Sequence, residues 1–173
     1  APPTPPAPPT PPPHPPLLPE SATYKFIFTT VRNPELGSGG IQLGRVKFYD
    51  FMLKELTISS IANPGGRDPT NGGNQGPEKL LTSEDRTKWM DANFAAPTFR
   101  SVLLINLASE ASLHAYEFFT PFDVPQRDPV GWELYRMDGS TQELLSTVTN
   151  YAAPLSRDSS YGIIGATAPP PPP

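Results

Sequence analysis

The sequence contains no cysteine, and this absence excludes several classes of protein at once. Without thiols there is no disulfide, no zinc–thiolate site and no cysteine nucleophile. The cellular compartment stays open, because a domain of this size can fold outside the cell without disulfides. N-glycosylation is not expected either, since no Asn begins an Asn-X-Ser/Thr sequon. Any glycan on this chain is therefore expected to be O-linked.

Clustered positive charge and long apolar runs are also missing. The 13 Lys and Arg residues are scattered singly, and the formal net charge at pH 7 is −4. Proteins bind nucleic-acid phosphates with clustered cations, so nucleic acid is not expected as a partner. No apolar run reaches the roughly 18 residues that a membrane-spanning helix needs, so no membrane span is expected.

Catalytic signatures are equally scarce. Of the two histidines, His14 lies in the proline-rich N-terminal segment with no acid or nucleophile near it, and we interpret His114, beside Leu113 and Tyr116, as a structural residue of an apolar strand. A catalytic triad needs a nucleophile on a strained turn, and no such motif occurs. The 17 Asp and Glu residues are dispersed, and nothing in the sequence favours the paired-acid chemistry of a glycosidase. We therefore expect that the protein is not an enzyme.

Proline is present in large excess, at 26 of 173 residues. Twelve prolines lie before Glu20, and five more end the sequence at residues 169–173. Proline fixes φ near −65° and removes a backbone donor, which leaves polyproline II as the regular conformation of these segments. The sequence thus divides into an arm (residues 1–19), one domain (20–165) and a tail (166–173).

The arm repeats X-Pro-Pro, and its period matches the polyproline II turn. With about three residues per turn and about 3.1 Å of rise per residue, the X positions of residues 1–16 line one edge of a rod roughly 50 Å long. Thr4 and Thr10 share this edge. The repeat lacks Gly, which excludes a collagen triple helix. An inert spacer and a glycosylated or partner-docked rod are the two interpretations.

Between the proline-rich segments, short stretches alternate large apolar residues with small or polar ones, as half-buried strands do. Nine strands are expected, at residues 24–31, 41–49, 54–58, 87–91, 100–107, 114–119, 130–135, 144–148 and 160–164. One helical turn is expected at residues 77–81, because Pro77 takes the favoured first position. Short strands separated by Gly, Pro and Asn predict an all-β antiparallel sandwich or jelly roll. Trp89 and Trp132 are expected in its core.

Several segments, taken in order, resemble the galactose-binding-like β-sandwich superfamily, which includes discoidin and coagulation-factor type C domains. They are Ile41-Gln-Leu43 with Val46-Lys-Phe48-Tyr49, Asn63-Pro-Gly-Gly66, Gly76-Pro-Glu-Lys-Leu80, Thr87-Lys-Trp89, residues 102–107, residues 116–119, and Arg127-Asp-Pro-Val-Gly-Trp132-Glu-Leu134. The resemblance spans roughly residues 24–165 and implies about eight antiparallel strands in two sheets, with ligand sites on loops at one end.

The resemblance also implies a structural calcium in the turn before the Thr-X-Trp motif. Family members carry an Asp-Gly pair there, and this pair is missing from residues 81–87. Thr82, Asp85 and Thr87 are the side chains that remain to supply oxygen ligands. The alternative is a hydrogen-bonded turn. No other cofactor is expected.

The arm and tail resemble hydroxyproline-rich matrix glycoproteins, whose prolines are hydroxylated and O-glycosylated in Ala-Pro, Thr-Pro and Ser-Pro contexts. This second resemblance implies that glycans are attached along the arm. The candidate positions are Thr4, Thr10, Pro2, Pro3, Pro5, Pro6, Pro8, Pro9, Pro11 and Pro12.

A sandwich fold alone does not assign a function, because the superfamily includes lectins, lipid-binding modules and structural domains. A carbohydrate site would use planar polar side chains near an exposed aromatic ring. The candidates are Arg67, Asp68, Asn71, Asn74, Gln126, Arg127 and Asp128. For Arg127 and Asp128 the alternative is a charge-assisted bond that pins their loop.

Together these features predict an extracellular structural glycoprotein that self-assembles into a fibril, wall or matrix. The arm of one copy is expected to dock head-to-tail on the next, since a heterologous contact that does not close builds a filament. The expected partners are further copies of the chain, its covalent O-glycans and matrix polysaccharide. Two alternatives stay open: a lectin-like module on a proline-rich stalk, and a polyproline ligand for profilin- or WW-type domains.

Overall fold

The computed structural model describes residues 22–35, 39–70 and 74–167. The candidate glycan positions of the arm and the prolines of the tail lie outside these ranges. The described chain forms antiparallel strands with only two short 3₁₀ turns, η1 (Pro77–Leu81) and η2 (Pro125–Arg127). This architecture confirms the all-β prediction, and η1 coincides with the expected helical turn.

The larger sheet has five antiparallel strands in the order β10-β9-β1-β7-β5. Its central strand β1 pairs with β9 and β7 and turns Tyr24, Phe26 and Phe28 toward the core. The strands are β1 (Thr23–Val31), β5 (Ile58–Ala62), β7 (Ser101–Leu107), β9 (Pro129–Asp138) and β10 (Thr141–Val148).

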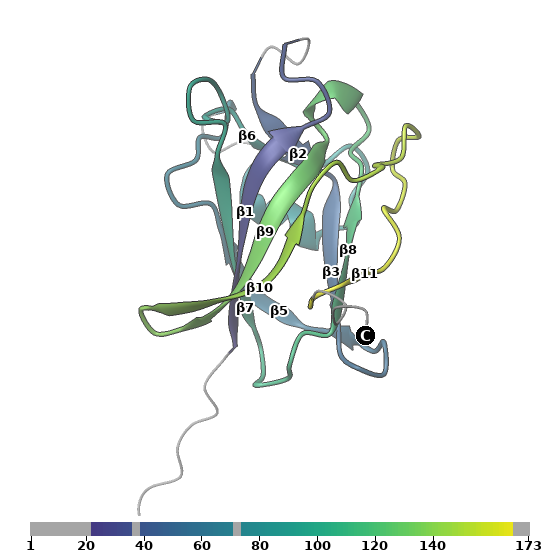
Figure 1. The fold of residues 1–173 in the computed structure, drawn as a ribbon. Coiled ribbons are helices and arrows are strands. Elements are labelled where there is room, and N and C mark those ends of the chain that lie inside the picture. Colours follow the sequence, from purple (N-terminus) through teal and green to yellow (C-terminus); the bar gives the residue numbers. More distant parts are fainter. Residues whose placement is uncertain (1–21, 36–38, 71–73, 168–173) are drawn as a thin grey trace, which may run out of the picture.

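The second sheet has four strands in the order β11-β8-β3-β4. They are β3 (Arg45–Tyr49), β4 (Glu55–Leu56), β8 (Ala115–Phe119) and β11 (Ile164–Gly165). A separate pair, β2 (Ile41–Leu43) with β6 (Trp89–Asp91), closes the end of the sandwich that lies uppermost in Figure 1.

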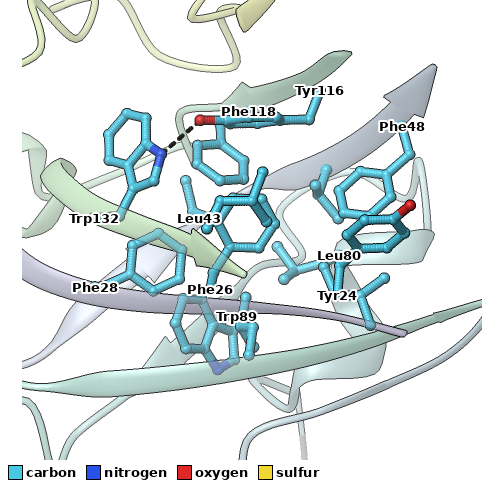
Figure 2. Close-up of a cluster of buried hydrophobic side chains, with 14 of the residues drawn as sticks. Tyr24, Phe26, Phe28, Leu43, Phe48, Leu80, Trp89, Tyr116, Phe118 and Trp132 are labelled. Carbon is cyan, nitrogen blue, oxygen red and sulfur yellow. Dashed lines mark hydrogen bonds between the residues drawn. The ribbon is translucent and has the colours of Figure 1, made fainter. Parts of the chain in front are cut away.

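The core between the sheets is mainly aromatic (Figure 2). Phe26 lies with its ring centroid 5.0 Å from that of Tyr116 and 5.2 Å from that of Phe118, so the two sheets meet through edge-on ring contacts. Such pairs add to the stabilisation that comes from burying their area. Trp89 and Trp132 are 1% and 0% exposed, which confirms their expected core position.

The expected strand 41–49 is two strands that belong to different sheets. β2 pairs with β6, whereas β3 pairs with β8, and the change of partner falls at Gly44. The Gly44 backbone passes so close to its neighbour that a Cβ atom there would lie 2.8 Å from the Thr120 carbonyl oxygen. The large apolar positions change phase at this glycine, from 41 and 43 in β2 to 46 and 48 in β3, and the prediction of one continuous strand overlooked that shift.

Other boundaries also differ from the prediction. Expected strand 54–58 comprises β4 and only the first residue of β5, and expected strand 160–164 contributes one bridge at Ser160 and the start of β11. His114 lies one residue before β8 and is exposed, so its predicted place within an apolar strand is wrong. Its backbone N–H nevertheless donates to the Tyr49 carbonyl.

Both ends of the domain lie at one end of the sandwich (Figure 1). The Ala22 carbonyl, just before β1, accepts a hydrogen bond from Leu107 N–H. At the other terminus, Gly165 pairs with Ala115, which in turn pairs with Tyr49 at the end of β3. The β3–β4 turn therefore lies at the end where the arm and the tail join the domain. Within the described ranges, no helix has the length and apolar character needed to cross a membrane.

Candidate functional site

The β3–β4 turn exposes three consecutive large apolar side chains. Phe51, Met52 and Leu53, called the apolar tip below, are 76%, 74% and 52% exposed. Turns are usually built from Gly, Pro, Asn, Asp and Ser, each of which satisfies a backbone requirement. An apolar run at such a position departs from ordinary turn chemistry, and apolar side chains gathered on a surface mark interaction sites.

Asp50 holds the apolar tip in one conformation. Its Oδ1 atom accepts hydrogen bonds from the backbone N–H groups of Met52 at 2.8 Å and Lys54 at 2.9 Å. The backbone closes the turn with Asp50 N–H donating to the Lys54 carbonyl and Leu53 N–H donating to the Asp50 carbonyl. Leu53 adopts φ of 60°, a left-handed conformation that is unfavourable for a branched side chain. The tip is thus a defined projection of the sheet.

Two pairs of ionisable side chains lie on the strands beside the tip. Lys47 binds Glu55 at 2.8 Å, and the Tyr49 hydroxyl donates to Glu117 at 2.6 Å. Burial, reinforced by this hydrogen bond to Glu117, raises the pKa of Tyr49.

Close to the arm's attachment point at Ala22, a polar hollow of about 590 Å³ is lined by residues that include Glu110, Arg136, Asp138 and Glu143.

At the opposite end, Asp91 organises the loop that runs from Asn63 to Pro77. Asp91 is 2% exposed, and its carboxylate accepts four hydrogen bonds. Two come from the backbone N–H groups of Arg67 and Asn93, at 2.9 and 2.8 Å, and two from the side chains of Asn63 and Ser101. A buried carboxylate with this many donors anchors the loop to β6 and β7.

Beside Asp91 lies a small cavity of about 110 Å³, called the loop cavity below. Its walls are Asn63, Gly66, Arg67, Asp68, Gln75, Gly76, Pro77, Trp89 and Met90. Within the described part of the chain, the buried oxygens Asn63 Oδ1 and Gln75 Oε1 have no hydrogen-bond partner. Buried acceptors of this kind are rare and call for a donor, which a water or ligand hydroxyl would supply.

The structure brings together only some of the predicted carbohydrate-binding residues. Arg67 and Asp68 line the loop cavity, and the Arg127 guanidinium approaches it through Met90, whose Sδ atom is 3.6 Å from Arg127 Nη1. Asn74 is exposed nearby, while Asn71 lies outside the described residues. Gln126 belongs to η2, and its carbonyl accepts a hydrogen bond from Asn33.

Asp128 does not face solvent, because its side chain is fully buried between two arginines. Arg157 binds both carboxylate oxygens, at 2.6 and 3.1 Å, and Arg32 lies at 3.4 Å. Burial raises the pKa of Asp128, while the two guanidinium groups act in the opposite direction. Asp128 therefore does pin its loop through charge-assisted bonds, and the arginines that form these bonds are Arg32 and Arg157.

The three predicted calcium ligands lie in a turn with its own hydrogen bonds. The hydroxyls of Thr82 and Thr87 are 3.1 Å apart, and each also donates to a backbone carbonyl, of Lys79 and Glu84 respectively. Asp85 is exposed. Across the described ranges, no cluster of three or more His, Asp or Glu side chains is arranged to hold a metal. Calcium at this turn stays a prediction.

Lys88 is a further buried ionisable group, with 3% of its surface exposed. Burial lowers its pKa, and Asp123 opposes this shift. A perturbed lysine in a cleft is a catalytic signature, but this ammonium spends its three N–H donors on Gln42 at 2.9 Å and on the two Asp123 oxygens at 2.6 and 2.7 Å. It therefore ties β2 to the loop after β8 and leaves no free position for a substrate.

Sequence reasoning missed the apolar tip and two walls of the loop cavity, Asn63 and Gln75. The tip has a local signal, since three apolar residues follow Asp50 where a turn must reverse the chain. Asn63 and Gln75 have no such signal. Both line the same cavity although they are far apart in the sequence, and only the fold brings them together.

Comparisons with known proteins find no matching family model, no similar curated protein and no similar solved structure. The galactose-binding-like resemblance therefore stays an interpretation of the sequence segments and of the observed fold class.

Proposed function

We propose that this chain is a non-catalytic building block of an extracellular structural assembly. In this proposal the β-sandwich supplies specific contacts between copies, and the proline-rich segments act as stiff, O-glycosylated spacers. The observation that carries it is the apolar tip, held rigid at the end of the domain where both proline-rich segments join.

Physical chemistry favours an interface at the tip. A partner surface that covered these three apolar side chains would gain roughly 25 cal/mol for each Å² of apolar surface removed from water. The turn that presents them is also conformationally unfavourable at Leu53. A rigid projection loses little conformational entropy when it binds, so more of the contact energy appears as affinity.

The buried ionisable groups support a structural role. Asp91, Asp128 and Lys88 all use their hydrogen-bonding capacity to fix loops to strands. Groups committed in this way stabilise the scaffold, and none is left facing a cleft in a reactive arrangement.

Deleting residues 1–16 from the full chain tests the proposal. The intact chain is expected to form concentration-dependent oligomers or filaments in light scattering and electron microscopy, and the shortened chain is expected to stay monomeric. Thermal unfolding serves as the control, because the deletion leaves every described residue in place. Filaments of unchanged length and abundance after the deletion would contradict the proposal.

A lectin-like function is the second candidate, and the loop cavity favours it. Two buried acceptors without partners lie beside Arg67 and Asp68, an arrangement that suits sugar hydroxyls. We expect Arg67→Ala to abolish any glycan binding by the full chain on a glycan array, while Arg136→Ala, at the other end of the sandwich, leaves it intact. Failure of the full chain to bind any glycan would eliminate this candidate.

A further inference from the structure

We propose that the apolar tip is the docking site for residues 1–16 of a second copy of this chain. This inference rests on the proposed function and deepens it by naming the surface and its occupant. The tip consists of Phe51, Met52 and Leu53, and the occupant is the X-Pro-Pro repeat of the arm.

The chemistry of the two surfaces is complementary. Prolyl rings are apolar and their nitrogens carry no N–H, so a polyproline II helix is recognised mainly by ring contacts with aromatic and aliphatic side chains. Phe51 offers an exposed aromatic ring, and Met52 offers a flexible thioether that adapts to ring edges. The arm has no Asp, Glu, Lys or Arg among residues 1–16, so it requires no charged partner.

The surroundings of the tip argue against a charged or lipid partner. Lys47 and Glu55 neutralise each other, and Glu117 is bound by the Tyr49 hydroxyl. A peripheral membrane site normally adds a cluster of cations to its apolar residues, and the tip is flanked by Asp50 and the single cation Lys54. An uncharged apolar ligand fits this setting best.

Conformational entropy also favours this contact. The tip is fixed by Asp50, and the repeat of the arm favours a preformed polyproline II helix. Association therefore costs less conformational entropy than the docking of a flexible peptide onto a flexible loop.

Length allows the contact to form between copies. The rod expected for residues 1–16 spans roughly 50 Å, whereas the nine-residue strand β1 spans only about 30 Å. The arm joins the domain at the end that carries the tip, so an arm that runs along the length of the neighbouring domain can bring its first residues to the neighbour's tip. The contact is heterologous, because one surface is the arm and the other is the tip, and repetition builds an open filament.

Site-specific photocrosslinking tests the assignment directly. A photoreactive phenylalanine analogue replaces Phe51 in the full chain, and isotope-labelled and unlabelled chains are mixed in equal amounts before irradiation. We expect mass spectrometry to find crosslinks from position 51 to residues 1–16 that join labelled to unlabelled chains. Crosslinks confined to single chains, or crosslinks only to peptides outside residues 1–16, would overturn the inference.

A substitution series separates this inference from the proposed function. The variant Phe51→Ser/Met52→Ser/Leu53→Asn removes the apolar tip with residues that suit a turn, and Leu155→Ser removes a 73% exposed apolar side chain elsewhere as a matched control. We expect the tip variant to raise the concentration needed for assembly by at least about tenfold, the effect of losing one well-formed apolar contact. The control is expected to assemble like the unaltered chain, and thermal unfolding checks that both variants fold.

Each outcome of this series decides a different statement. If deleting residues 1–16 abolishes assembly and the tip variant assembles normally, the docking inference is wrong and the proposed function stands. If the deletion leaves assembly intact, the proposed function fails as well. Tip-dependent binding of the full chain to phosphatidylcholine vesicles, without tip-dependent assembly, would assign the tip to lipid and overturn the inference.

Discussion

At the scale of single residues, the core depends on polar atoms that lie among its aromatic rings. Trp132 Nε1–H donates to the Tyr116 hydroxyl at 2.7 Å, and both side chains are 0% exposed (Figure 2). Burial raises the pKa of Tyr116 to about 12, while the hydrogen bond from Trp132 acts in the opposite direction. This phenol therefore links the stability of the core to alkaline pH.

The sign of that link follows from the direction of the shift. Between pH 10 and about 12 the unfolded chain has lost the phenolic proton and the folded chain keeps it, so the free energy of unfolding falls as the pH rises through this window. We expect Tyr116→Phe to weaken this alkaline dependence. The variant should also be less stable at pH 7 by about 1–3 kcal/mol, because Trp132 N–H loses its acceptor. Urea unfolding at several pH values, followed by tryptophan fluorescence, measures both effects, and identical pH dependence in the two proteins would refute the prediction.

Residue-scale partners were the hardest feature to predict from the sequence. The motif around Asp128 suggested a pinned loop, and the structure has one, but the pinning arginines lie 96 and 29 positions away. Arg157 has no local sequence pattern that marks it as an ion-pair partner of Asp128. A carboxylate's partners are fixed by how distant loops meet, and residue spacing carries no information about that.

At the scale of the elements, Gly44 is the point where one apolar stretch of sequence, residues 41–49, passes from one sheet to another. A side chain at this position would meet backbone atoms of Thr120 and Pro121 at 2.8 and 3.1 Å, and backbone cannot move aside cheaply. The glycine thus lets the chain pass close to Thr120 between β2, which pairs with β6, and β3, which pairs with β8.

We expect Gly44→Ala to destabilise the protein by about 2 kcal/mol through this overpacking. Gly165→Ala is the matched control, since its added Cβ would make only an ordinary contact at 3.6 Å. Chemical denaturation of the two variants compares them directly. Equal denaturation midpoints for the two variants would show that the loop after β8 moves to accept the added Cβ without loss of stability, and would contradict the prediction.

Alternation of side chains located the strands but not their limits. All nine expected stretches overlap a strand or bridge of the structure, because half-buried strands impose a period of two. The continuation of β5 through Ser59 and Ser60 was missed, since both residues are polar and exposed at the edge of the larger sheet. The apolar tip was missed for the opposite reason, because a turn made of Phe, Met and Leu has none of the usual turn residues.

At the scale of the whole molecule, the division into a sandwich and proline-rich segments was open to prediction from composition. Short alternating stretches and the scarcity of helical patterns lead to an all-β domain, and proline density marks the arm and tail. The relative placement of the two ends of the domain and the apolar tip could not be predicted in this way, because it depends on the order of strands in each sheet.

The proposed glycoprotein character has a whole-molecule test. Intact mass spectrometry of the chain purified from its natural source is expected to show added mass from hydroxylation and from pentose or hexose. Proteolytic peptides from residues 22–167 should be unmodified, while peptides from residues 1–16 should carry the sugars. An arm of unmodified mass would contradict the glycosylated-spacer proposal and favour the polyproline-ligand alternative.

The placement of both ends of the domain has a mechanical consequence. Tension applied between the arm and the tail enters the domain through β1, which is nine residues long and bonded on both sides to β9 and β7. It leaves through β11, which has two residues and is bonded on one side to β8. Under load we expect β11 to detach first, because it has fewer backbone hydrogen bonds than β1. In the fibril proposed above, each domain would then have one strong and one weak attachment, and would lengthen at β11 before the rest of the domain unfolds.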